Sequence, residues 1–269
     1  VISRQFPEAF REMRVQHLAA GFRRLLDTLE AGARAIAGGA PRIVLLTPGS
    51  YSETHFEQAW LARYLGLPLV VGGDLTVLGD GLFLKTVEGL QPVHGVLRRV
   101  DDDFCDPLEL RPDSALGVPG LLQVARAGRV VMANALGSAF LESPALMGFL
   151  PGIAQRLLGA SLLMPSVPSW WCGEPAAWAD VRRQIDGKLL RNAFPIGSRT
   201  SQVHAYSEAL VEGDPDAWTL QAQVRLSRAP IWSQGALHQR PALVRVYAIA
   251  DARGGWHVLP GAMTRVAPR

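Results

Sequence analysis

The sequence predicts an α/β protein whose first part holds a parallel sheet and whose second part is rich in antiparallel strands. Short apolar runs alternate with helical patterns up to about residue 165, as parallel α/β folds require. Beyond that point paired alternating segments dominate, which is typical of antiparallel strands. Hydrophobic residues make up 48% and charged residues 19% of the 269 residues, so we expect a folded core rather than disorder.

Residues 1–40 are expected to form a helical N-terminal segment. Apolar side chains recur at helical spacing over residues 7–36, and the pair Gly38–Gly39 ends the pattern. Residues 41–165 are expected to form the α/β domain. It is predicted to contain strands at 42–46, 67–71, 93–100 and 130–133, a hairpin at 75–85, and helices at 52–64, 119–127 and 144–158.

Residues 166–269 change character and are expected to form a second, β-rich domain. An irregular aromatic stretch at 170–173 is followed by a strand at 189–191 and a polar loop at 197–200. Further strands are predicted at 221–226, 242–250 and 256–259, and their alternation favours an antiparallel arrangement.

Composition excludes several classes of protein. The net charge is +3 and the basic residues are scattered, whereas a nucleic-acid binder concentrates them on one face. Apolar stretches are too short and too interrupted by Gly and Pro to span a bilayer, so no membrane partner is expected. Two distant cysteines, Cys105 and Cys172, fit reduced thiols in a cytoplasmic protein. The six histidines are dispersed without metal-ligand spacing, so we expect no metal site.

The densest polar segment is the strand-end cluster, residues 98–111, which follows the predicted strand at 93–100. Parallel sheets place ligand sites at the carboxyl ends of their strands, so this cluster is a candidate substrate site. Its arginines and carboxylates suit a zwitterionic substrate, and a solvated turn with local ion pairs is the alternative interpretation. We include Asn134, at the end of the next strand, in the candidate substrate-binding set of Arg98, Arg99, Asp101, Asp102, Asp106 and Asn134.

One other loop is a weaker candidate. The loop at 47–50 precedes a helix and can offer backbone N–H groups to an anion, but it lacks a glycine fingerprint, and an ordinary strand-to-helix connection is the favoured interpretation. The absence of that fingerprint also argues against a nicotinamide-dependent oxidoreductase. The serines have no nucleophile-elbow context, so no hydrolase triad is supported and no catalytic residue is assigned.

Several long segments together resemble one family. These are LTPGSYSETHFEQAWLARYLGLPLVVGGDL, LRRVDDDFCDPLELRPDSALGVPGLL, VMANALGSAFLESPALMGFLP, PSVPSWWCGEP and, towards the end, VRLSRAPIW, PALVRVYAIA and GGWHVLPGAMTRVA. In this order they resemble the circularly permuted ATP-grasp family, type 2, related to glutathionylspermidine synthase. The resemblance covers nearly the whole chain.

The resemblance implies a pre-ATP-grasp-like parallel-sheet domain at 41–165 and a partial ATP-grasp-like lobe at 166–269. It also implies ATP and Mg²⁺ as cofactors, with a small-molecule carboxylate and an amine or peptide as substrates. An acyl-phosphate forms and the amine attacks it, while Mg²⁺ and cationic side chains neutralise the phosphates. Carried over residue by residue, the nucleotide-binding candidates are Arg191, Gln221, Gln223 and Arg245.

The sequence also departs from the family pattern. Ser143–Pro144 stands where relatives have an Asp-Lys pair, and Ala222 replaces an acidic residue. The chain contains only two lysines, opens on Val1, and begins after the magnesium-binding block of its relatives, so it resembles a piece shortened at both ends. We therefore expect either a ligase fragment that is inactive alone and binds neither cofactor well, or a non-catalytic ATP-grasp-like binding or scaffold protein.

Overall fold

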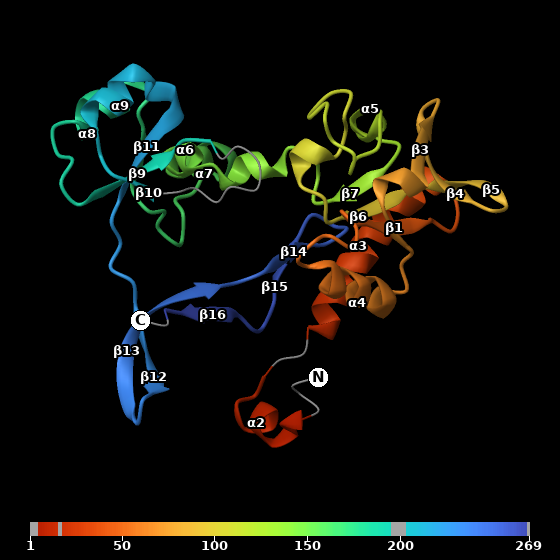
Figure 1. Ribbon diagram of the computed structural model, residues 1–269, viewed down its shortest axis with the longest axis horizontal. Coiled ribbons are helices and arrows are strands. Elements are labelled where there is room, and N and C mark those ends of the chain that lie inside the picture. Colours follow the sequence, from red (N-terminus) through yellow and green to blue (C-terminus); the bar gives the residue numbers. More distant parts are fainter. Residues whose placement is uncertain (1–4, 16–17, 195–202, 268–269) are drawn as a thin grey trace. The chain divides into compact units, whose positions relative to one another are not determined.

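The computed structural model describes residues 5–15, 18–194 and 203–267 (Figure 1). Internal contacts divide the chain into two compact units. Unit 1 comprises residues 1–100, 104–135 and 226–269, and unit 2 comprises residues 101–103 and 136–225. The sequence placed 166–269 together, whereas the contacts group 226–269 with the N-terminal half; the predicted domain limits at 40 and 165 remain a prediction. The polar loop expected at 197–200 lies outside the described residues.

A four-stranded parallel sheet forms the centre of unit 1, as predicted. Its order is β2-β1-β6-β7, with strands β2 (Leu69–Val70), β1 (Ile43–Leu46), β6 (Gly95–Arg98) and β7 (Val131–Ala133). All neighbouring pairs are parallel, and Leu45 lies opposite both Leu69 and Leu97. Every residue of β1 is buried, which explains why this strand is continuously apolar in the sequence.

Helices α3 (Ala19–Ala37) and α4 (His55–Leu65) supply the other half of this core. Leu26, Leu29 and Ala33 of α3 pack with Leu61 of α4 and Leu45 of the sheet. Both helices end at a glycine with positive φ, Gly38 and Gly66, where a left-handed residue closes the last turn.

The single helix predicted over residues 7–36 is wrong in its first half. The structure forms α2 (Pro7–Glu12), a break, and then α3. Helix α2 buries no residue, whereas α3 buries a full stripe against the sheet. Helical spacing alone stabilises little without burial of an apolar face, so the pattern overestimated the length of the helix.

Antiparallel strands complete unit 1. The predicted hairpin at 75–85 is present and extends to a third strand. The sheets are β3 (Leu75–Leu78), β4 (Gly81–Thr86) and β5 (Gly89–Val93); β12 (Arg228–Ser233), β13 (Ala236–Arg245) and β16 (Met263–Val266); and β14 (Ala248–Ala250) with β15 (Trp256–Val258). Short helical turns η1 (Gly72–Asp74), η2 (Asp102–Phe104, of which 102 and 103 belong to unit 2) and α5 (Leu121–Arg126) occupy the loops.

Unit 2 contains one antiparallel sheet of order β10-β9-β11-β8. Its strands are β8 (Ser169–Trp171), β9 (Lys188–Asn192), β10 (Val203–His204) and β11 (Trp218–Ala222). The helices are η3 (Ser138–Glu142), α6 (Pro144–Met147), α7 (Leu150–Leu158), α8 (Pro175–Val181), α9 (Glu208–Gly213) and η4 (Pro215–Ala217). The antiparallel pairing after residue 165 confirms the predicted β-rich second half.

The two faces of the unit 2 sheet differ in character. Leu190, Leu220 and Trp170 lie opposite one another and pack with Val181 and Val211 in the core. Because strand side chains alternate, the intervening residues point to the other face. That second face carries Leu189, Arg191, Ser169, Trp171, Thr219 and Gln221, and we call it the polar face.

No helix in the described part of the chain is both long enough and apolar enough to cross a membrane.

Candidate functional site

The carboxyl edge of the parallel sheet gathers polar residues from three strands. Strand β1 leads into Thr47, β6 ends at Arg98 and Arg99 follows it, and β7 leads into Asn134. Since all these strands run in one direction, their carboxyl ends lie along the same edge of unit 1. The sequence predicted this edge as a ligand site, and the structure brings Arg98, Arg99 and Asn134 to it.

Arg98 links the ends of β6 and β7. Its Nε donates to the carbonyl oxygen of Asn134 at 3.2 Å, and its terminal nitrogens donate to the carbonyl oxygens of Val100 at 2.6 Å and Ala135 at 3.5 Å. The side chain is half-buried, so its charge is used largely to hold these loop carbonyls in place. Arg98 therefore shapes the edge, and Asn134, which is exposed, contributes its backbone carbonyl to this link.

Arg99 has a different environment. Its backbone N–H donates to the carbonyl oxygen of Leu46 at 2.9 Å, which fixes the start of the loop beside β1. Its side chain is exposed, and within the described residues no hydrogen bond or ion pair is recorded for its guanidinium. An arginine held by its backbone but free at its tip can bind a carboxylate or phosphate with two parallel hydrogen bonds.

The neighbouring loop at 47–50 is held by its own side chains. The Thr47 hydroxyl lies 2.5 Å from Oε1 of the Gln58 amide and accepts the N–H of Gly49 at 3.1 Å. Nε2 of Gln58 in turn donates to the Thr54 hydroxyl at 2.8 Å. Because the Gly49 N–H already has a partner, it is not available to an anion in this arrangement, and the anion-cradle interpretation loses one of its donors.

Asp106 was expected to bind substrate, but its side chain is not accessible to a ligand, which corrects that expectation. It is fully buried, and its carboxylate accepts three backbone N–H groups, from Leu108 at 2.9 Å, Gly120 at 3.1 Å and Leu122 at 2.9 Å. The Asp106 carboxylate thus fixes the loop at 106–120 and the start of α5. The sequence showed a row of aspartates but could not tell which one turns inward.

The carboxylate of Asp102 also accepts hydrogen bonds from backbone N–H groups. Its Oδ2 accepts the N–H groups of Gly137 at 3.0 Å and Ala139 at 2.9 Å, at the start of η3. Asp101 is exposed. Residues 101–103 group with unit 2, whereas Arg98 and Arg99 belong to unit 1. A segment that is continuous in sequence is therefore divided between two structural units, and neither unit brings the whole predicted set together.

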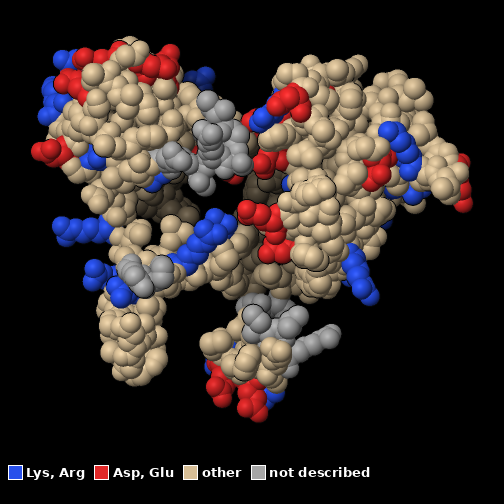
Figure 2. All heavy atoms as spheres, in the orientation of Figure 1, with Lys and Arg blue, Asp and Glu red and all other residues tan. Residues whose placement is uncertain are grey.

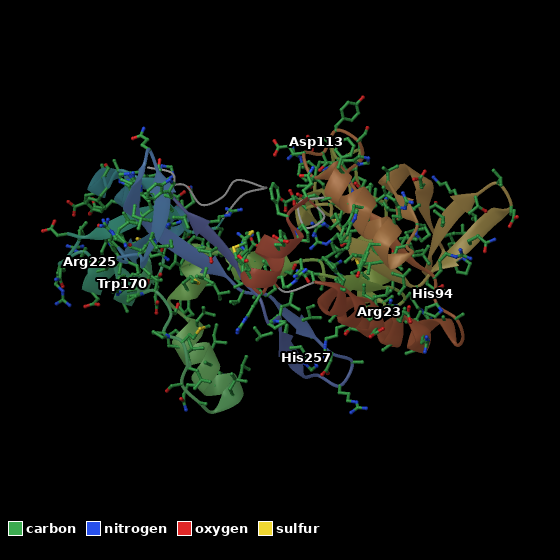
Figure 3. All side chains as sticks on the ribbon, turned by 90° about the horizontal axis from the view of Figure 1, so that it is seen from below. Arg23, His94, Asp113, Trp170, Arg225 and His257 are labelled. Carbon is green, nitrogen blue, oxygen red and sulfur yellow. The ribbon has the colours of Figure 1, made fainter. Side chains whose placement is uncertain are left out.

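The polar face in unit 2 brings together two of the predicted nucleotide-binding residues. On β9, Arg191 lies opposite Thr219 of β11, and Leu189 lies opposite Gln221. Arg191 and Gln221 are therefore diagonal neighbours on one face, and both are half-buried. Trp170, labelled in Figure 3, lies on the same sheet but packs against the core on the opposite face.

The other two nucleotide-binding candidates lie elsewhere. Gln223 follows β11, is exposed, and donates its backbone N–H to the carbonyl oxygen of Gly187 at 3.0 Å. Arg245 ends β13 in unit 1 and is exposed. Residues 218–250 contain four arginines and no Asp or Glu, and Figure 2 shows no acidic side chain on the visible face of the β12–β13 hairpin. Positive charge of this kind attracts anions in general, and the nucleotide-binding role expected for Arg245 stays a prediction.

Ser169 is a residue that the sequence reasoning missed. It lies on β8 directly opposite Gln221 and is almost completely buried on the polar face, with 8% of its surface exposed. Its segment, PSVPSWWCGEP, was part of the family resemblance but had no role assigned. The available signal was a serine placed just before two tryptophans in a strand, which is too common to identify a site.

Pro144, which stands at an expected lysine position, has a structural role. It is the first residue of α6 and is buried, and the next residue, Ala145, donates its backbone N–H to the carbonyl oxygen of Ala193 at 3.1 Å. Among the residues that the structure describes, no group of three or more His, Cys, Asp and Glu side chains is placed to hold a metal ion, so no Mg²⁺ ligands are assigned here.

Similar proteins identify the family of this chain. The family model described as circularly permuted ATP-grasp type 2 matches residues 1–267. Two uncharacterised proteins of Mycobacterium tuberculosis are similar. One is 36% identical over 85% of this chain and 26% of its own length, and the other is 34% identical over 99% of this chain and 49% of its own length. An uncharacterised protein of Synechocystis is 33% identical over the whole chain and 57% of its own length.

The chain thus spans between about a quarter and somewhat more than half of these relatives. A solved structure, the ATP-grasp ligase PsnB complexed with a minimal precursor, aligns with a TM-score of 0.40 and 12% identity, covering 84% of this chain and 74% of that chain. A likeness this distant adds no argument about the site. The match of the family model over almost every residue is decisive by itself: the chain belongs to the circularly permuted ATP-grasp type 2 family.

Proposed function

We propose that this chain is part of an ATP-dependent carboxylate–amine ligase, related to glutathionylspermidine synthase-like enzymes, and that its polar face contacts the nucleotide. The observation that carries the proposal is the placement of Arg191 and Gln221 on one face of the unit 2 sheet, in a chain of this family. A cation beside an amide suits a nucleotide, since the guanidinium can neutralise phosphate and the amide can pair with a base.

The substrate site is proposed at the carboxyl edge of the parallel sheet. Arg99 is the residue best suited to bind the carboxylate substrate, because its guanidinium is exposed at a fixed loop. Arg98 and the backbone of Asn134 shape that edge, and the buried carboxylate of Asp106 holds the following loop. In unit 2, the exposed Asp101 is a separate candidate for attracting the amine or a peptide substrate, and Asp102 holds the turn that begins η3.

When bound, ATP would supply the phosphoryl group that activates the carboxylate, and Mg²⁺ would neutralise phosphate charge. On this chain Arg191 and Gln221 fit a nucleotide by their common face and chemistry. The described carboxylates do not fit Mg²⁺, because no three of them gather at one place. Asp102 and Asp106 in addition accept hydrogen bonds from backbone N–H groups. We therefore assign this chain a contribution to nucleotide and substrate binding and derive no metal-dependent step. The buried free cysteines, Cys105 and Cys172, support a cytoplasmic location.

Calorimetric titration with MgATP tests the nucleotide site. We expect weak binding, and we expect Arg191→Met to raise the dissociation constant by about tenfold, the loss of one charge-assisted contact of about 1.4 kcal/mol. Arg183→Met is the matched control, because Arg183 lies in the same unit, is exposed and pairs with Asp180. Equal affinity of the Arg191 variant and the parent chain would refute the proposed nucleotide face.

A non-catalytic ATP-grasp-like binding protein is the second candidate. The observation in its favour is Pro144, which is buried at the start of α6 where the family has a lysine. A residue packed in this way cannot contact a phosphate. If a longer protein containing this chain bound MgATP but never released ADP with any carboxylate and amine, this second candidate would be favoured.

A further inference from the structure

The amide of Gln221 has a defined orientation, and a neighbouring serine sets it. Nε2 of Gln221 lies 3.1 Å from Oγ of Ser169, and the same Oγ lies 2.9 Å from the carbonyl oxygen of Val167. A carbonyl oxygen can only accept, so the single hydroxyl proton of Ser169 is donated to Val167. The hydroxyl oxygen must then accept from Gln221, which requires the NH₂ end of the amide to face Ser169.

The opposite end of this amide is therefore an acceptor. With the NH₂ group directed to Ser169, Oε1 of Gln221 is turned away from it, and within the described residues no hydrogen bond to Oε1 is recorded. An oxygen and a nitrogen of an amide are assigned by their partners, and here the chain Gln221–Ser169–Val167 permits one assignment. Ser169 is nearly buried, so water does not readily replace it as the partner.

The surroundings of this acceptor suit a flat base. Leu189 lies directly opposite Gln221 on β9 and is half-buried, which places an aliphatic side chain beside the amide. Arg191 lies two residues further along β9 on the same face, so a cation follows the apolar position. On this face, Oε1 of Gln221 can accept from the edge of a base, Leu189 can pack against its ring, and Arg191 can neutralise its phosphates.

We propose that Ser169 is a positioning residue that holds Gln221 with its carbonyl oxygen towards the base, so that the site selects purines carrying an amino group at position 6. Adenine donates from that amino group to Oε1, whereas hypoxanthine and guanine present a carbonyl oxygen there, and two acceptors cannot pair. A site built around one fixed polar group rejects a ligand that leaves the group unpaired. This inference rests on the proposed nucleotide role of the polar face.

The test compares MgATP with MgITP, which differ only at position 6 of the base. Binding of each nucleotide to the 269-residue chain is followed by ¹H–¹⁵N NMR up to about 10 mM, a range that detects weak complexes with free energies near −3 to −4 kcal/mol. We expect the parent chain to prefer MgATP by about tenfold, the discrimination given by one matched rather than mismatched hydrogen bond.

Ser169→Ala removes the partner that orients the amide. The Gln221 side chain can then rotate and present either end, so we expect the preference for MgATP to fall to about twofold or less. Ser169→Thr keeps the hydroxyl in a strand that tolerates β-branched residues, and it should restore the preference. Ser166→Ala is the matched control, because Ser166 lies in the same unit and its hydroxyl bonds to the carbonyl oxygen of Met147 instead.

The outcomes separate this inference from the proposed function. A preference that is lost in Ser169→Ala, kept in Ser166→Ala and restored in Ser169→Thr supports it. If MgATP binds but the preference is absent in the parent chain or unchanged in Ser169→Ala, the inference is overturned while the nucleotide face stands. If neither nucleotide binds at 10 mM, the proposed nucleotide face fails and the inference fails with it. A merely structural serine would change the stability of the sheet but not the ratio of the two affinities.

Discussion

At the scale of single residues, Asp106 shows how a carboxylate can serve the fold instead of a ligand. Three backbone N–H groups converge on it in a site that is fully buried. Asp106→Ala leaves these donors without an acceptor, so we expect a loss of about 3 kcal/mol in the free energy of unfolding, measured by urea denaturation.

Asp103→Ala is the control for Asp106, since Asp103 is a neighbouring exposed aspartate. A change within about 0.5 kcal/mol is expected for it, as for most surface substitutions. If Asp106→Ala were as stable as Asp103→Ala, the carboxylate would have no structural role, and the substrate-binding interpretation of Asp106 would regain its support.

The placement of residues at strand ends was easier to predict than the direction of their side chains. The sequence placed Arg98, Arg99 and Asn134 at strand ends, because parallel strands and their register follow from apolar runs. It did not indicate that Arg98 binds loop carbonyls while Arg99 stays exposed, since that depends on the path of residues 134–135. Ser169 was missed for the same reason, because its partner Gln221 is distant in sequence and adjacent only through antiparallel pairing.

At the scale of elements, the turn η1 packs against a distant loop with no space for a side chain. A Cβ atom at Gly72 would lie 2.4 Å from the carbonyl oxygens of both Leu116 and Gly117. These are backbone atoms and cannot move aside cheaply. We therefore expect Gly72→Ala to lower the free energy of unfolding by about 2 kcal/mol, as overpacking does, in a thermal or urea melt.

Gly73→Ala is the adjacent control, because a Cβ atom there meets nothing within 4 Å. It should be neutral or raise stability by up to about 1 kcal/mol, through the lower entropy of the unfolded chain. Similar losses for Gly72→Ala and Gly73→Ala would mean that flexibility of the turn, rather than close backbone approach, is the property that matters.

The core of unit 2 has a titratable thiol that gives an expected pH dependence. Burial raises the pKa of Cys172 from 9.0 to about 11. Between these values the folded chain keeps a proton that the unfolded chain releases, so the stability from this group decreases as pH rises from 9 towards 11. We expect the stability difference between the parent chain and Cys172→Ala to narrow over that range, measured by urea denaturation at several pH values. A difference that stays constant from pH 8 to 11 would contradict the raised pKa.

Elements that bury an apolar face were predicted well, whereas the segment without buried residues was not. Strand β1, helix α4 and the hairpin β3–β4 follow the sequence patterns closely, because their apolar residues pack into a core. The first half of the expected helix at 7–36 has no buried residue, and there the pattern gave the wrong length. The expected strand at 93–100 is split at His94, where β5 ends and β6 begins.

At the scale of the whole molecule, each unit carries a different set of the proposed binding residues. Unit 1 carries the exposed Arg99 at the carboxyl edge of a parallel sheet, and unit 2 carries Arg191 and Gln221 on an antiparallel sheet. The family resemblance predicted both architectures. It did not predict that residues 226–269, with Arg245, would group with the N-terminal half, since sequence order gives no information about such a return of the chain.

The last prediction concerns the chain by itself, which we expect to bind MgATP more weakly than about 10 µM, or −7 kcal/mol, and to show no ligase turnover. Phosphoryl transfer needs dense positive charge around the terminal phosphates. Neither of the two lysines of the chain is placed on the polar face. Lys85 donates to the carbonyl oxygen of Gly73 in unit 1, and Lys188 donates to Gln184 and lies over the Trp170 ring, on the face opposite Arg191.

Position 144 is a buried proline, so Arg191 is the cation that the unit 2 sheet offers on its polar face. One arginine can bind phosphate but cannot fix the γ-phosphate for in-line transfer. ADP release by the pure chain, with MgATP and mixed carboxylates and amines, measures this directly, and added ADP verifies the coupled assay. Sustained ADP production that disappears in Arg191→Met would mean that the chain holds a working site. Production that persists unchanged in Arg191→Met would instead identify a contaminating ATPase.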